Sequence, residues 1–176
     1  MTRARRIGAS RRGRAARVLA LALVAGVLAS EREVGAESWG GLTPGETVRS
    51  GVEALYGRPS RERSLVEEGR TVAEWTYAGE RAPRGLERMV VSFGLMAGGG
   101  FAPDVLRSVA LYAKPKVFSL RAISTGWGPP DAVGTEEATG RPSFHYRTRG
   151  LLIILDKTGV WAEFLLFGPR QAGGGS

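Results

Sequence analysis

The stretch GLTPGETVRSGVEALYGRP, residues 41–59, carries the helix signal from which the fold can be worked out. Thr43 is a favourable N-cap, Pro44 suits the first helical position, and Glu46 lies three residues after the cap. This T-x-x-E spacing is typical of a capping box, in which two side chains satisfy backbone N–H groups that the first turn leaves free. We therefore expect a helix that begins at Thr43.

The same stretch predicts the buried face of this helix and its end. Val48, Val52 and Leu55 follow one another at i, i+4 and i+7, which places them on one apolar stripe. Gly57 is suited to the left-handed residue that ends a helix, and Pro59 prevents the helix from resuming. The helix is expected to end at Gly57 and to pack through that stripe.

Three strands are expected after this helix and a polar stretch from Ser60 to Arg70. Residues 71–77 alternate apolar and polar side chains, as in a half-buried strand. Residues 86–93 and 105–112 read as the second and third strands, joined through the glycine-rich residues 97–100. A short helix is an alternative for residues 105–112.

The pattern then starts again, with Gly128 lying 71 residues after Gly57. Residues 117–127 have helical apolar spacing, and residues 144–146, 150–155 and 160–167 read as three strands. We therefore predict an α+β fold with two tandem helix-plus-three-strand repeats, residues 41–113 and 114–170. These repeats would form one antiparallel sheet with helices packed on one face. The alternative is a chance coincidence of two helix ends.

The first 29 residues predict a cleavable signal peptide. Seven arginines in residues 1–17 precede twelve uncharged residues, which at about 1.5 Å each are too short to span a membrane as a helix. Cleavage is expected after Ala29, with Ala36 as a second candidate, although a retained anchor is an alternative. Ser10-Arg11-Arg12 resembles a twin-arginine signal, so both the Sec and the Tat routes stay open. Residues 30–40 would form a linker and residues 171–176 a flexible tail.

Removal of the signal changes the charge of the chain. The whole sequence carries +8, but residues 1–29 contain seven of its 25 basic residues and none of its 17 acids, which leaves +1. Nucleic-acid binding is therefore not expected. The chain has no cysteine, which excludes a lipidated N-terminal cysteine, disulfides and thiolate metal sites. No transmembrane segment is expected after cleavage.

The motifs in the sequence that resemble catalytic ones are better explained by structure. Asp156-Lys-Thr-Gly159 matches the phosphorylation motif of P-type ATPases, but it is better interpreted as a turn between two strands. Gly98–Gly100 lacks the Gly-Lys-Ser/Thr of a phosphate loop. Glu67-Glu68 and Glu136-Glu137 read as solvated surface. His145 is the only histidine, so no metal or other cofactor is expected. A small exported hydrolase or ligand-binding enzyme that uses His145 with an acid is the alternative function.

A sheet surface is the better candidate for function. The residues expected to face the helices are Ala73, Trp75, Tyr77, Met89, Val91, Phe93, Phe144 and Tyr146. The opposite face would then carry the predicted partner-binding residues, which are Glu74, Arg88, Arg107, His145, Arg147 and Trp161. Arginine together with an aromatic residue is typical of protein-recognition surfaces, although an ordinary solvated face is the alternative.

The unit Gly-Leu-Thr-Pro-Gly-Glu-x-Val…Leu-Tyr-Gly-x-Pro, followed by Trp-x-Tyr, resembles the SmpA/OmlA (BamE-type) domain family of the outer-membrane assembly machinery. The resemblance covers residues 41–93 and, more weakly, residues 126–167, and the doubled unit resembles the β-lactamase-inhibitor-protein-like fold. It implies an envelope-associated domain that binds protein. The chain lacks the lipid-bearing cysteine of that family.

Together these features predict an exported, periplasmic or secreted, non-enzymatic domain that recognises a protein partner in the envelope or extracellular space through its open sheet face. A purely structural envelope component is a further alternative. The oligomeric state stays open.

Overall fold

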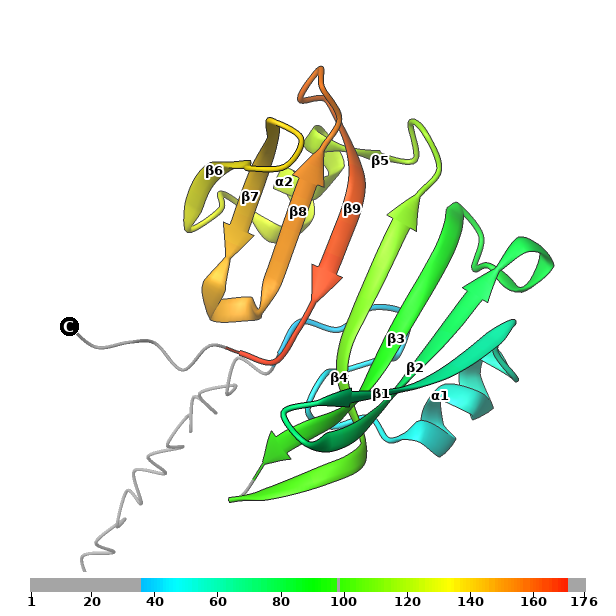
Figure 1. The fold of residues 1–176 in the computed structure, drawn as a ribbon. Helices are drawn as coiled ribbons and strands as arrows, with labels where there is room; N and C mark the ends of the chain where they lie inside the picture. The colour runs from blue at the N-terminus through cyan, green and yellow to red at the C-terminus, as the bar shows by residue number, and fades with distance from the viewer. Residues whose placement is uncertain (1–35, 98, 171–176) are drawn as a thin grey trace, which may run out of the picture. The chain divides into compact units, whose positions relative to one another are not determined.

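The computed structural model of this chain describes residues 36–97 and 99–170. The signal peptide predicted for residues 1–29, the cleavage site at Ala29 and the predicted tail at residues 171–176 lie outside the described residues. Within the described part, nine strands form one antiparallel sheet with the order β1-β2-β3-β4-β9-β8-β7-β6, and the ninth strand, β5, pairs with β9 (Figure 1). No helix in these residues is long and apolar enough to cross a membrane.

The elements divide into two halves of this sheet. The first half contains α1 (Arg49–Tyr56), β1 (Arg61–Glu67), β2 (Arg70–Ala78), β3 (Leu86–Ala97) and β4 (Gly100–Ala113). The second contains β5 (Phe118–Ser119), α2 (Leu120–Trp127), β6 (Ala132–Glu136), β7 (Arg141–Tyr146), β8 (Leu151–Leu155) and β9 (Trp161–Phe167). Single 3-10 turns, η1 (Gly79–Arg81) and η2 (Arg147–Arg149), follow β2 and β7. Both α-helices lie behind the sheet in Figure 1, so its front face is open.

The predicted α+β fold of two helix-plus-three-strand repeats is wrong. The described chain is mostly strand, with one large nine-stranded antiparallel sheet and only two short α-helices. The expectation missed β1 and β6, which form the two edges of the sheet. β1 is almost entirely exposed, and the half-buried residues of β6 are Ala132, Gly134 and Glu136, so neither strand shows the apolar alternation by which the inner strands were found.

The helix predicted to begin at Thr43 begins at Arg49 instead. Residues 43–47 form a separate turn, in which the N–H of Thr47 donates to the carbonyl of Thr43 over 2.9 Å. Gly45 has a φ of +87°, which a helix does not allow. The N–H of Gly45 donates to the carbonyl of Leu106 in β4, and the N–H of Leu106 donates to the carbonyl of Thr47. These hydrogen bonds pair residues 45–47 with β4, so the helix begins only at Arg49.

The shorter helix α1 buries a narrower face than predicted. Val52 is fully buried, but Val48 and Leu55 are 43% and 56% exposed. Tyr56, four residues after Val52, packs against the core instead. In α2 the predicted inward residue Ile123 is buried, as expected. One contiguous cluster of buried side chains from both halves lies between the sheet and the helices.

Two residues of the predicted linker, Glu37 and Trp39, contact the two helices. Glu37 accepts a hydrogen bond from the indole nitrogen of Trp127 over 3.1 Å and forms an ion pair with Arg149. Trp39 stacks on Tyr56, with ring centroids 6.2 Å apart. Residues 37–39 therefore contact α2 through one side chain and α1 through another.

Candidate functional site

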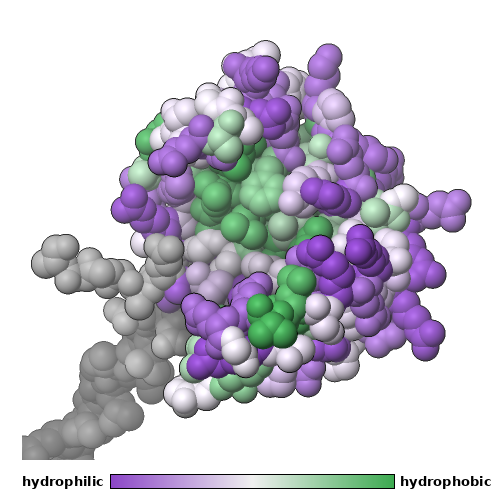
Figure 2. Space-filling view, viewed as in Figure 1, coloured by the Kyte–Doolittle hydropathy of each residue, from purple (hydrophilic) through white to green (hydrophobic). Residues whose placement is uncertain are grey.

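The open face of the sheet carries an apolar strip over its central strands (Figure 2). We define this apolar strip by six half-buried side chains of β4, β8 and β9, namely Ala110, Tyr112, Leu152, Ile154, Phe164 and Leu166. The register pairs Tyr112 with Phe164 and Phe164 with Ile154, so the side chains adjoin across all three strands. The rings of Tyr112 and Phe164 meet edge to face, 5.1 Å between centroids. An open antiparallel face usually carries polar side chains at these positions.

Two open depressions lie at opposite ends of the apolar strip along the strand direction. One has a volume of about 490 Å³, and its charged lining residues are Glu87, Glu136, Arg141 and Glu163. The other has a volume of about 580 Å³, and its polar lining residues include His145, Arg147 and Arg170. We call them the acidic end and the basic end.

The charges of the acidic end are held in place by local contacts. Arg141 forms an ion pair with Glu163, which leaves two further carboxylates in the lining. The carboxylate of Glu136 accepts hydrogen bonds from the hydroxyl of Thr139 and from the N–H of Ala138. The Thr139 hydroxyl is the largest cause that lowers the pKa of Glu136, so this carboxylate is ionised at neutral pH.

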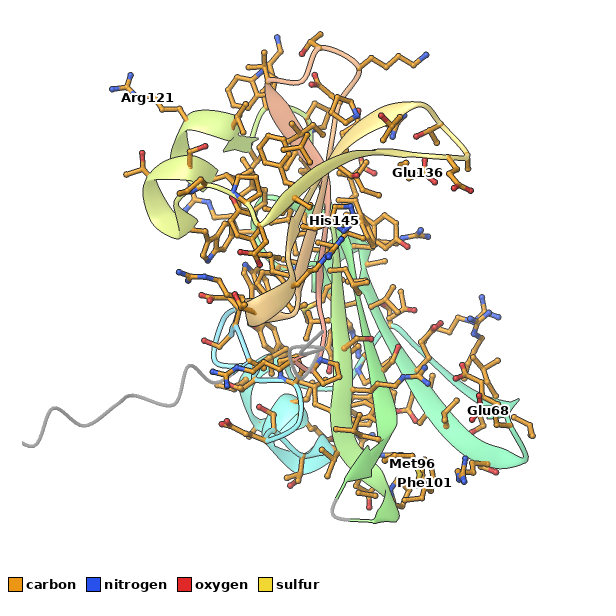
Figure 3. The ribbon with its side chains drawn as sticks, turned by 90° about the vertical axis from the view of Figure 1, so that its left-hand side faces the viewer. Glu68, Met96, Phe101, Arg121, Glu136 and His145 are labelled. Atoms are coloured by element: carbon orange, nitrogen blue, oxygen red, sulfur yellow. The ribbon has the colours of Figure 1, made fainter. Side chains whose placement is uncertain are left out.

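The basic end holds the only histidine. The Nε2 atom of His145 lies 3.1 Å from the hydroxyl oxygen of Ser143, and Figure 3 shows His145 and Glu136 on the side of the sheet away from the helices. Ser143 is only 3% exposed. Among the described residues, no carboxylate forms a hydrogen bond with the His145 ring. A hydrolase would need a reachable nucleophile and a group that orients the base, and the hydroxyl beside the His145 ring belongs to the buried Ser143.

Beside the apolar strip, the open face carries charged side chains of β1, β2 and β3. Arg63 on β1 forms an ion pair with Glu74 on β2 at 2.7 Å. The guanidinium of Arg88 lies 3.8 Å from the ring centroid of Tyr112 and so borders the apolar strip. Further along the sheet, Arg107 forms an ion pair with Glu67.

The structure distributes the predicted partner-binding residues over several places. Glu74 and Arg88 line one shallow depression, and Arg107 lines another with Glu67. His145 and Arg147 both line the basic end. Trp161 begins β9, where it pairs with Ser119 of β5, and lines none of these depressions. The six residues therefore do not form one site.

Sequence reasoning missed the apolar strip, although a signal for it was present. Residues 151–155 are uninterrupted Leu and Ile, and residues 164–167 are Phe and Leu throughout. Such runs are typical of strands that are covered on both faces. The structure covers only one face of these strands, which leaves Leu152, Ile154, Phe164 and Leu166 on the other.

The turn predicted at Asp156–Gly159 is confirmed. The Asp156 carboxylate accepts hydrogen bonds from the Thr158 hydroxyl and from the N–H groups of Val160 and Trp161, and Gly159 has a φ of +72°. Desolvation acts to raise the pKa of Asp156, but the hydrogen bonds outweigh it and the pKa is lowered. The motif therefore serves as a strand connection. No group of residues suited to hold a metal ion occurs within the described ranges.

Comparisons with known proteins do not assign this chain to a family. No family model matches the chain, and no curated protein matches it. Among solved structures, a DUF4309 family protein, YjgB from Bacillus subtilis, is 13% identical with a TM-score of 0.47. The match covers 78% of this chain and 90% of that one. A similarity of this size carries no argument about fold or function.

Proposed function

We propose that this chain is an exported, non-enzymatic domain that binds a protein partner through the open face of its sheet. The observation that carries the proposal is the apolar strip, which lies at the centre of the open face and has charged groups at its margins. Protein interfaces combine an apolar, aromatic-rich centre with a polar rim, and arginine and tyrosine are enriched at their energetically important positions. Tyr112 with Arg88 stacked on it fits that description.

The chemistry of the face defines the kind of partner. The centre of the face favours apolar side chains of the partner, because Leu152, Phe164 and Leu166 offer apolar surface and no hydrogen-bonding groups. The acidic end favours basic groups and the basic end favours acidic ones. A partner surface with an apolar centre and opposite charges at its two ends would satisfy the whole strip.

Site-specific photocrosslinking in the producing cell tests this function. The photoreactive residue p-benzoylphenylalanine replaces Leu152 in the apolar strip and, as a matched control, replaces the exposed Ala122 on α2. We expect irradiation to link a protein at position 152 and not at position 122. A second variant, Leu166→Glu, should abolish the crosslink at 152 because it places a charge in the strip.

Equal crosslinking at positions 152 and 122, or none at 152, would argue against the open face as a binding surface. Circular dichroism of each purified variant shows whether it is folded. Identification of the linked protein by mass spectrometry then defines the partner.

The amino-acid pattern of residues 1–29 supports export, and residues 41–59 support the resemblance to the SmpA/OmlA family. Both stay predictions. N-terminal sequencing of the protein recovered from the periplasm or medium should begin at Ser30. A chain that begins at Met1 in the cytoplasm would contradict export, and a start at Glu37 would move the cleavage site to Ala36.

A further inference from the structure

The two ends of the apolar strip carry opposite charge, and this makes the open face complementary to itself. We infer that a second copy of this chain binds the open face, so that two sheets pack face to face in a two-fold dimer. The inference rests on the proposed function, because it names the partner of the same surface. The alternative occupant, a different protein, is an outcome of the test below.

The direction of the strands determines how the charges meet. Along β8 and β9 the acidic end adjoins Ile154 and Phe164, whereas the basic end adjoins Leu152 and Leu166. A two-fold axis that lies in the interface and runs across the strands reverses this direction. It therefore places the acidic end of one copy over the basic end of the other. In such an isologous interface every contact occurs twice.

The apolar strip supplies the centre of the interface. Sheets packed face to face lie about 10 Å apart, and their side chains interdigitate. The strip of one copy would then cover the strip of the other, removing the half-exposed Phe164, Leu166 and Leu152 from water. The edge strands β1 and β6 lie outside this apolar centre, because the strip lies on the inner strands β4, β9 and β8.

The positions of Arg147 and Glu136 across the sheet determine which charged residues meet in the dimer. Arg147 follows β7 directly, and Glu136 ends β6, the neighbour of β7. The two-fold axis keeps lateral position and reverses only the strand direction. Arg147 of one copy is therefore expected to face Glu136 of the other, and the same pair forms again on the opposite side of the axis.

Charge reversal with mixing tests this arrangement by sedimentation equilibrium of the processed chain. Arg147→Glu alone creates two Glu–Glu contacts per dimer, and Glu136→Arg alone creates two Arg–Arg contacts. Each should weaken dimerisation by at least about tenfold. An equimolar mixture of the two variants forms a heterodimer in which both contacts are complementary, so dimerisation should return. The control Arg121→Glu on the exposed side of α2 should dimerise like the unmodified chain.

Recovery in the mixture also shows that both variants are folded. An unmodified chain that stays monomeric at all concentrations overturns the inference, as does a mixture that does not recover. A monomeric chain whose position 152 still crosslinks to another protein would overturn the dimer and leave the proposed function standing. Absence of any crosslink at position 152 would remove both.

Discussion

Tyr77 in the first half of the sheet and Tyr146 in the second make the same contact. Each hydroxyl donates a 3.0 Å hydrogen bond to the carbonyl of the glycine that ends the helix of its own half, Gly57 or Gly128. Both glycines have nearly equal backbone angles, with φ of +69° and +74°. The two halves therefore hold a helix against the sheet by the same means.

The open faces of the two halves differ. In the first half, β1 and β2 present charged side chains that pair with one another, such as Arg63 with Glu74, and β4 adds Ala110 and Tyr112 to the apolar strip. The second presents Leu152 and Ile154 on β8 and Phe164 and Leu166 on β9. These four apolar side chains of the second open face do not belong to the cluster of buried core residues. We therefore expect a binding function on the open face, where the two halves differ.

The largest effect is expected from neighbouring isoleucines on opposite faces of β8. Ile153 is fully buried, whereas Ile154 is half-buried on the open face. Ile153→Ala should lower the free energy of unfolding by about 2–5 kcal/mol because it leaves a cavity. Ile154→Ala should lower it by less than about 1.5 kcal/mol. Urea denaturation at low protein concentration measures both values. Equal losses would mean that the open face also belongs to the core.

The two tyrosine contacts provide the next test. Tyr77→Phe and Tyr146→Phe each remove one hydrogen bond to a helix-end carbonyl, which should cost about 1 kcal/mol. The same denaturation experiment compares the two variants. A loss in one half only would show that the shared geometry does not have a shared energetic role.

The tyrosine of the first half should also affect stability at alkaline pH. Burial, with smaller repulsion from Glu53 and Glu62, raises the pKa of Tyr77 to about 12. An unfolded tyrosine titrates near about 10. The free energy by which protonated Tyr77 stabilises the fold is therefore fully present below the pKa of the unfolded chain. It is lost as the pH rises through the pKa of the folded chain. Between these two values the unmodified chain should lose more stability than Tyr77→Phe, and parallel losses would argue against burial as the cause.

The helix starts of the two halves should respond differently to mutation. The side chain of Ser119 accepts a hydrogen bond from the N–H of Ala122 at the start of α2, whereas α1 has no side-chain cap. Ser119→Ala should cost about 1 kcal/mol. Thr43→Ala should cost less than about 0.5 kcal/mol, since Thr43 precedes α1 by a separate turn. A larger loss at Thr43 would indicate that the turn contributes to the start of the helix.

The smallest effect is expected for the polar open face. A double-mutant cycle with Arg63→Ala and Glu74→Ala should give a coupling of about 0.2–1 kcal/mol that falls in 1 M salt. Arg63 is 45% exposed, so solvent screens the pair. A larger coupling that does not change with salt would indicate a structural role for this face.

Parts of the molecule that have a regular sequence pattern were predicted from the sequence. The alternation in residues 71–77 and 86–93 corresponds to β2 and β3, and the residues expected to face the helices pack in or against the core. The edge strands β1 and β6 were not predicted, because neither buries a row of apolar side chains and so neither has a periodic apolar signal. Trp161 was expected on a shared surface, but its place beside β5 depends on a two-residue strand that no pattern indicates.

The local features of this protein follow from its amino-acid sequence: the ends of both helices at Gly57 and Gly128, the turn at Asp156, and the faces of the inner strands. Each of these depends on residues that are close in the chain. Three other features are set by tertiary contacts: β4 and β9 join the two halves, Gly45 pairs with Leu106 and shortens α1, and the apolar strip stays uncovered. These three features depend on backbone pairing between segments that are distant in the chain, and local sequence patterns do not specify which segments pair.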